Sequence, residues 1–179
     1  MAEESQTAKT AKTENAETES AEADGANARA VFRVENILIK NVSLEIPSAV
    51  VSPSFSREPT VKLELRNSAR PLSRENYYEA LLETTVRLFS GEDLQLLAEI
   101  SQAGVLFIQN ADARAREEIL NIQAPEILYP YAGHLAGDLL MRAGAPRMFL
   151  PPFNFRALYQ KKLAAAQKAA ETPVPAKPS

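Results

Sequence analysis

The chain has no cysteine and a single histidine, His134, among its 179 residues. Without cysteine it cannot form disulfides, thiolate nucleophiles, iron–sulfur clusters or cysteine-ligated zinc sites. One imidazole also removes the mechanisms and most of the metal sites that need two histidines from one chain. Redox-thiol and ordinary zinc chemistry are therefore excluded, and the composition is compatible with a reducing compartment.

Motifs with a known mechanism are lacking as well. There is no glycine-rich phosphate loop, no GxSxG elbow and no helix with paired histidines. His134 and Asp138 are four residues apart, but zinc needs three or four ligands, so we expect a structural or surface role for them. Glu83 and Glu99 fall on polar strand faces, where solvated charge is ordinary, and we do not expect a glycosidase pair. The sequence favours a protein without catalysis or a cofactor.

Long apolar runs and a strong charge of one sign are also absent. No run approaches the roughly 20 residues that span a bilayer, and the acidic N-terminus is unlike a signal peptide, so we expect no membrane insertion. Residues 1–29 predict a disordered acidic tail, and residues 164–179 a flexible tail rich in alanine, proline and lysine. The middle of the chain is nearly neutral, which argues against nucleic-acid binding. We expect one domain over residues 30–163.

Apolar and polar residues alternate with the period of a strand through the first half of this domain. The first strand is predicted over residues 32–46, with its even positions buried, and the second over residues 61–65. Residues 78–88 and 94–108 predict a hairpin, with a bulge or bend at Gly104. Four successive strands predict an antiparallel sheet.

Three apolar residues fall on the faces expected to be polar: Ile37, Ile39 and Leu97. They are either scattered surface hydrophobes or part of an oligomer or partner contact. In the second interpretation, Leu97 forms a mixed apolar and acidic patch with Glu45 and Glu99, which would suit a basic partner.

The pattern becomes helical after residue 110. Asp112 predicts the start of a helix that Pro125 ends, and Asn154 caps a last helix. Between them, a helix is predicted from Pro130 to Gly144. Its buried residues are expected to be Tyr131, Leu135, Leu139 and Leu140, and Gly133 with Gly137 should permit a close helix contact. Strands followed by helices predict an α+β fold.

At this point the chain resembles a known family, the protein-export chaperone SecB. The C-terminal half carries APEILYPYA at 124–132, RAGAP at 142–146 and LPPFNFRALY at 150–159. The strand region agrees, with FRVENILIKNVSLEIP at 32–47, PTVKLEL at 59–65, GED at 91–93 and LAEISQAG at 97–104. The resemblance covers roughly residues 31–163.

The resemblance implies a four-stranded antiparallel sheet with helices packed on one face, assembled as a homotetramer, a dimer of dimers. It implies an ATP-independent holdase of the bacterial cytoplasm that keeps precursor proteins unfolded and delivers them to the translocase ATPase SecA. No catalysis is implied. The family reads a small, basic, zinc-bearing module of SecA, so the zinc belongs to the partner.

Site residues follow from the resemblance position by position. The SecA-docking patch maps to Glu45, Leu97 and Glu99, and a further family acid falls at Asn41, where the charge is lost, so that docking is weaker there or another acid compensates. The strand that the family links to client binding and oligomer integrity, or plain core packing, maps to Leu96, Ala98, Ile100 and Gln102. On apolar character, we expect a client groove around Phe55, Val61, Leu63, Tyr129 and Tyr131.

Two alternatives remain. A SecB-like chaperone dedicated to an antitoxin would share the fold but lack the docking patch, so the presence of Glu45, Leu97 and Glu99 argues against it. A ligand-binding or enzymatic α+β domain would need a compact pocket with perturbed titratable groups, which the residue inventory does not suggest.

Overall fold

The strands come first in the chain and the helices follow. The computed structural model describes residues 29–47, 53, 55 and 59–171. Its strands are β1 (Val31–Glu45), β2 (Thr60–Pro71), β3 (Tyr77–Ser90) and β4 (Asp93–Gln109). They form one antiparallel sheet in the order β1-β4-β3-β2, so β1 and β2 are its edges. The predicted α+β fold is confirmed, and of the predicted tails residues 1–28 and 172–179 lie outside the described residues.

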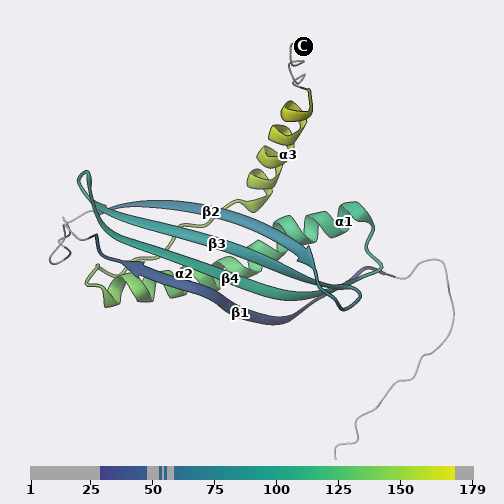
Figure 1. Ribbon diagram of the computed structural model, residues 1–179, viewed down its shortest axis with the longest axis horizontal. Coiled ribbons are helices and arrows are strands. Elements are labelled where there is room, and N and C mark those ends of the chain that lie inside the picture. The colour runs from purple at the N-terminus through teal and green to yellow at the C-terminus, as the bar shows by residue number, and fades with distance from the viewer. Residues whose placement is uncertain (1–28, 48–52, 54, 56–58, 172–179) are drawn as a thin grey trace, which may run out of the picture.

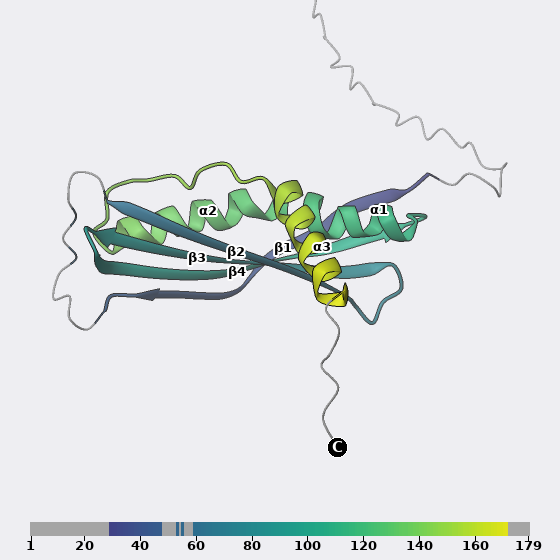
Figure 2. The same ribbon diagram turned by 90° about the horizontal axis from the view of Figure 1, so that it is seen from above.

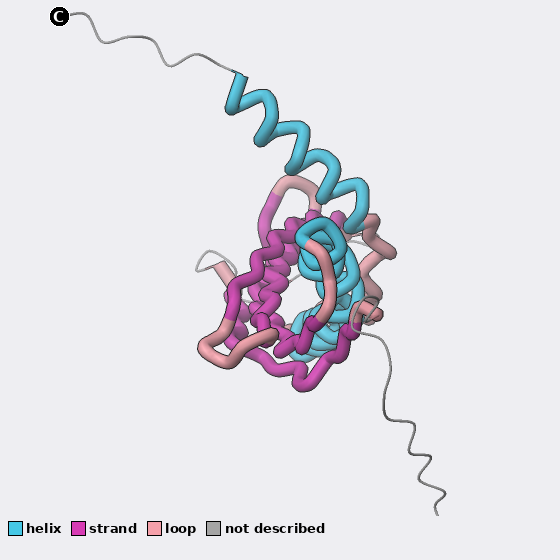
Figure 3. The backbone as a smooth tube through the Cα atoms, turned by 90° about the vertical axis from the view of Figure 1, so that its right-hand side faces the viewer, coloured by secondary structure: helices cyan, strands magenta, loops and turns pink. Residues whose placement is uncertain are grey.

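The helices cover one face of this sheet. They are α1 (Ala113–Glu118), a π-helical turn η1 (Ile119–Gln123), α2 (Ala124–Arg142) and α3 (Phe155–Glu171). Helix α2 lies across β3 and β4, and α3 projects away from the sheet (Figure 1, Figure 2). Seen end-on, α1 and α2 lie on a single side of the curved sheet (Figure 3). We call this face the helix side and the opposite face the open side.

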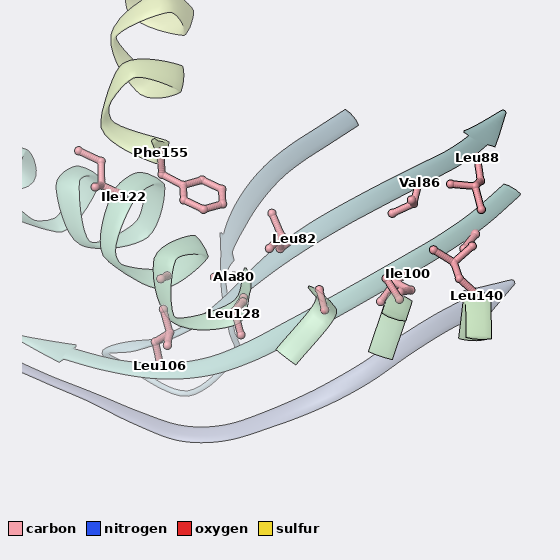
Figure 4. Packing of buried hydrophobic residues seen from close by; sticks show 14 of the residues in the cluster. Ala80, Leu82, Val86, Leu88, Ile100, Leu106, Ile122, Leu128, Leu140 and Phe155 are labelled. Carbon is pink, nitrogen blue, oxygen red and sulfur yellow. The ribbon is translucent and has the colours of Figure 1, made fainter. Parts of the chain in front are cut away.

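The core forms between the helix side and α2. In β4 the even positions from Leu96 to Ile108 point toward the helices, and they meet a stripe of α2 with four-residue spacing (Figure 4). That stripe consists of Ala124, Leu128, Ala132, Ala136 and Leu140. Its three alanines let the helix backbone approach the sheet closely, because a small side chain leaves no bulk between the layers.

The register of β1 corrects the predicted alternation. Shifts between Val34 and Asn36 and between Ile39 and Asn41 each insert one extra residue opposite β4. Each extra residue moves the following side chains to the other face. Between the two shifts, Ile37 pairs with Gly104 and Ile39 pairs with Gln102, both on the helix side. Ile37 therefore packs against the core, and the prediction that Ile37 and Ile39 share a sheet face with Glu45 and Leu97 is wrong.

Gly104 itself is not a bulge. It is paired regularly on both sides, and a Cβ atom there would lie 3.1 Å from Cδ2 of Leu128. The irregularity lies in the neighbouring strand β1, while the glycine allows close approach of α2. A glycine at position 104 is needed because the strand packs closely against a helix there, and not because the strand bends.

The predicted break at Pro125 is also wrong. In the π-helical turn η1, the backbone N–H of Ala124 bonds to the carbonyl of Ile119, one residue further back than in an α-helix. This wider turn directly precedes Pro125, which lacks an N–H, and the helix continues through it. The predicted start at Pro130 is therefore an interior position of α2.

Both predicted caps are confirmed. The Asp112 carboxylate accepts a hydrogen bond from the Ala115 N–H at 2.7 Å, and the Asn154 side chain accepts one from Ala157 at 2.9 Å. Helix α3 continues to Glu171, so residues 164–171 are helical where a flexible tail was expected. Five of these eight residues are alanine, which has the highest intrinsic helix propensity.

Candidate functional site

The four residues of the predicted docking patch lie together on the open side. Glu45 of β1 pairs with Leu97 of β4, and Ser43 of β1 pairs with Glu99 of β4. Asn41 lies two residues before Ser43 on the same strand face. The Ser43 hydroxyl lies 3.5 Å from Oε2 of Glu99. Glu45, Glu99 and Asn41 are exposed, and Leu97 is half-buried. We call these four residues the docking patch, whose geometry combines two solvated carboxylates with an apolar centre.

The carboxylates of the patch differ from most others on the open side. Glu79 pairs with Lys40 and Arg70, each at 2.9 Å, and Glu64 pairs with Arg87 at 2.6 Å. The hydrogen bond from Lys40, aided by Arg70, holds the pKa of Glu79 below its usual value, against the effect of burial. In the part of the chain that the structure describes, neither patch carboxylate has a cation within 4.0 Å. No cation of the described residues therefore neutralises the two carboxylates of the patch in an ion pair.

The second predicted set lies in the core. Leu96, Ala98, Ile100 and Gln102 all point to the helix side and are buried beneath α2. The Gln102 side-chain amide donates a hydrogen bond to the backbone carbonyl of Leu38. Of the two interpretations left open from the sequence, core packing describes these positions within one chain, and their side chains are not accessible to a client in this conformation.

The predicted groove residues do not form one surface. Leu63 and Phe55 pack against the core, and Val61 is exposed at the edge strand β2. Tyr129 and Tyr131 are two residues apart on α2 and therefore point to nearly opposite sides of the helix. The expected burial of Tyr131 is wrong, because 54% of the residue is exposed.

Tyr129 instead anchors the segment that follows α2. Its hydroxyl donates to the Pro151 carbonyl at 2.6 Å, and burial raises the pKa of this hydroxyl. Its ring packs edge-on against Phe155, with ring centroids 5.6 Å apart. Tyr129 thus has a structural role in holding residues 145–154 alongside the helix.

An apolar surface that the sequence analysis missed lies on the outside of α2. Met141 and Phe149 are exposed, Phe149 to 78%, and both border a shallow hollow of about 240 Å³. A second hollow of about 210 Å³ adjoins it, between Tyr129 and Phe149. We call Met141 and Phe149 the apolar strip. The sequence carries no periodic signal for Phe149, because this residue lies in an extended, proline-rich segment at 145–152.

The two glycines of α2 accommodate this same segment. A Cβ atom at Gly137 would lie 3.1 Å from the Met148 carbonyl oxygen, and one at Gly133 would contact Leu150 at 3.7 Å. The close contact predicted from Gly133 and Gly137 is therefore made with an extended segment rather than with another helix.

The one histidine and its acidic neighbour lie at the surface of α2. The His134 and Asp138 side chains approach to 3.8 Å on the surface, and no third ligand joins them in the described part of the chain. No helix within residues 59–171 is both long and apolar enough to cross a bilayer.

Comparisons with known proteins agree with this architecture. The family model described as preprotein translocase subunit SecB matches residues 25–166. Protein-export protein SecB of Pseudomonas syringae pv. tomato is 35% identical over 147 residues, which cover 80% of this chain and 87% of the relative. The protein of the same name from Stenotrophomonas maltophilia is 35% identical over 142 residues, covering 79% and 82%.

A solved structure shows the same fold. A SecB-like chaperone of Mycobacterium tuberculosis, in complex with an antitoxin peptide, matches with a TM-score of 0.59 at 14% identity. The match covers 68% of this chain and 90% of that one. The length and identity of the curated relatives, together with the family model, give the assignment. The chain belongs to the SecB family of protein-export chaperones.

Proposed function

We propose that this chain works as an ATP-independent holdase, which binds unfolded precursor proteins and delivers them to the translocase ATPase SecA. The observation that carries the proposal is the apolar strip of Met141 and Phe149, which lies beside shallow hollows. Wide, shallow apolar surface suits extended segments that bind in several registers with little selectivity. Release then follows from transfer to a partner and requires no nucleotide.

Assembly into a homotetramer would multiply these weak sites. Edge strand β1 exposes Ile39, Val42 and Ile46, which supports association of chains along this edge. Several modest contacts on one client raise the avidity without a strong individual site. The assembly would favour slow-folding clients whose segments stay exposed for long enough to engage several sites.

The docking patch supports SecA as the partner. It lies on the open side, whereas the apolar strip lies beyond α2 on the helix side, so the sheet separates the two surfaces. A client and SecA can therefore bind at the same time. Unpaired acids around Leu97 suit the small basic module of SecA that the family binds, and such docking weakens with salt.

Membership of the SecB family supports a protein without catalysis or a cofactor, working in the bacterial cytoplasm. Among the described residues, the titratable groups with shifted pKa values are Glu79, Tyr129 and Tyr159, and each has a structural partner: Lys40, the Pro151 carbonyl and Glu117, respectively. The patch also argues against a chaperone dedicated to an antitoxin, although the fold is shared.

Separable variants test the proposal. Leu97→Ser and Glu99→Gln are expected to weaken binding of purified SecA at least fivefold while leaving the affinity for an unfolded precursor within twofold. Phe149→Ser is expected to weaken binding of the unfolded precursor at least fivefold while leaving the affinity for SecA within twofold. Titration calorimetry measures both partners on the same preparations. Patch variants that bind SecA as tightly as the parent would remove the docking assignment.

A further inference from the structure

One carboxylate of the open side lies next to the docking patch but belongs to another strand. Ser101 of β4 pairs with Asn41 of β1 on one side and with Glu83 of β3 on the other. The three side chains therefore form one row across the open side. Because neighbouring strands are about 4.8 Å apart, Glu83 lies about 10 Å from the position where the family patch carries an acid and this chain has Asn41.

Glu83 is as free of cations as the patch acids. It is exposed, and among the residues that the structure describes no cation lies within 4.0 Å of its carboxylate. Its neighbour in register on β2 is Arg66, which does not form an ion pair with it. By contrast, Glu64 on the same face is neutralised by Arg87 at 2.6 Å. An uncompensated carboxylate keeps its field for an incoming charge.

A hollow connects Glu83 with the patch. Its volume is about 170 Å³, and its lining residues are Glu64, Arg66, Glu83, Thr85, Arg87 and Glu99. Glu99 belongs to the docking patch, so the hollow continues that surface toward β3 and β2. The hollow could accommodate about five water molecules or the end group of one long side chain. The two unpaired carboxylates, Glu83 and Glu99, lie on its wall.

We propose that Glu83 replaces the acid missing at Asn41, and that Glu83 and Glu99 together receive one lysine or arginine side chain of the basic partner in this hollow. The proposal rests on SecA docking as described above. Charge complementarity selects a cationic side chain, because two unpaired carboxylates on the wall of the hollow stabilise an ammonium or guanidinium group and repel an acid. Arg66 also lines the hollow and repels the same cation, so removal of its charge should strengthen binding.

The test is a titration of purified SecA with the full-length assembled protein at 0.05 M and 0.5 M salt. At low salt, Glu83→Gln is expected to raise the dissociation constant about fivefold, and Arg66→Gln is expected to lower it about twofold. Both effects should shrink at high salt because the pairs are solvent-exposed. Glu126→Gln removes the same charge from the first turn of α2, on the other side of the sheet, and should change nothing.

Rescue makes the assignment specific. Adding Asn41→Asp to Glu83→Gln puts a carboxylate back at the other end of the row and is expected to restore parental affinity. Circular dichroism and native mass verify that every variant is folded and assembled. If Glu83→Gln binds SecA like the parent while Glu99→Gln is weakened, the role of Glu83 is overturned and the docking function stands. If the parent does not bind SecA, both are overturned.

Discussion

The side-chain amide of Gln102 donates a hydrogen bond to the backbone carbonyl of Leu38, 3.0 Å away. Gln102 is a buried polar residue among apolar neighbours of β4, and Leu38 lies in β1 between the two register shifts. The bond joins a core position to the irregular edge strand. It gives the buried amide a partner and fixes the part of β1 that carries the second shift.

Loss of this bond is expected to destabilise the fold. Gln102→Met keeps the length of the side chain but removes the donor, and leaves the Leu38 carbonyl without this partner. The free energy of unfolding in urea should fall by about 1 kcal/mol. Gln109→Met, at the exposed end of β4, is the matched control and should fall within about 0.5 kcal/mol of the parent. Equal stability of the two variants would contradict the structural role of Gln102.

Replacement of Thr84 is expected to raise the free energy of unfolding. Its hydroxyl is buried on the helix side and is the one buried side-chain polar atom without a partner among the described residues. Valine has nearly the same shape as threonine, and Thr84→Val removes the unsatisfied hydroxyl. We therefore expect the free energy of unfolding to rise by about 1 kcal/mol. Thr85→Val, on the open side, serves as the control. A less stable Thr84→Val protein would show that the hydroxyl has a partner.

The ion pairs of Glu79 are expected to make the free energy of unfolding depend on pH in the acid range. Its hydrogen bond from Lys40, with Arg70 close by, sets its folded-state pKa below the usual value of 4.5. Above that value the unfolded and folded chains both carry the charge and the stabilisation is complete. As pH falls through the lower folded-state pKa, the group protonates and the stabilisation is lost.

The measurement compares urea unfolding of the parent and Glu79→Gln from pH 7 to pH 3. The parent should be more stable at pH 7, and the difference should narrow below about pH 4.5. Glu75→Gln, which is exposed in the turn before β3, should show no such dependence. A constant difference across this pH range would contradict the assigned ion pairs.

Strands and caps could be predicted from the sequence because their determinants are local. Alternation placed all four strands, and the side chains of Asp112 and Asn154 act within three residues of their own positions. The shifts in β1 depend on pairing with β4, which is distant in sequence, so strict alternation misplaced Ile37. Likewise, proline is a sound stop signal only where the helix cannot widen, and the turn before Pro125 does widen.

The positions of the candidate site residues could likewise be predicted only in part. The shared face of Glu45, Leu97 and Glu99 could be predicted because β4 has no shift near Leu97 and Glu99, and both shifts of β1 lie before Glu45 and restore its face. The groove could not, because Tyr129 and Tyr131 were grouped by composition although helix geometry separates them. Phe149 was missed because an extended segment has no period that marks an exposed residue.

The apolar strip predicts a specific loss of client binding. Phe149→Ser removes the most exposed aromatic side chain of the strip. Its affinity for an unfolded precursor should fall about tenfold, in line with loss of a buried phenylalanine contact. Leu163→Ser, which removes an exposed apolar residue from α3, is the matched control and should bind like the parent. Fluorescence anisotropy of a labelled precursor reports both, and equal affinities would place the client surface elsewhere.

The refolding rate of a urea-unfolded precursor tests the holdase function most directly. The precursor is diluted from urea with and without a molar excess of this protein, in the absence of nucleotide, after the native mass of the protein has been measured. We expect a tetramer that slows refolding several-fold and holds the precursor in a form that SecA binds. An unchanged refolding rate in the presence of folded protein in excess would contradict it.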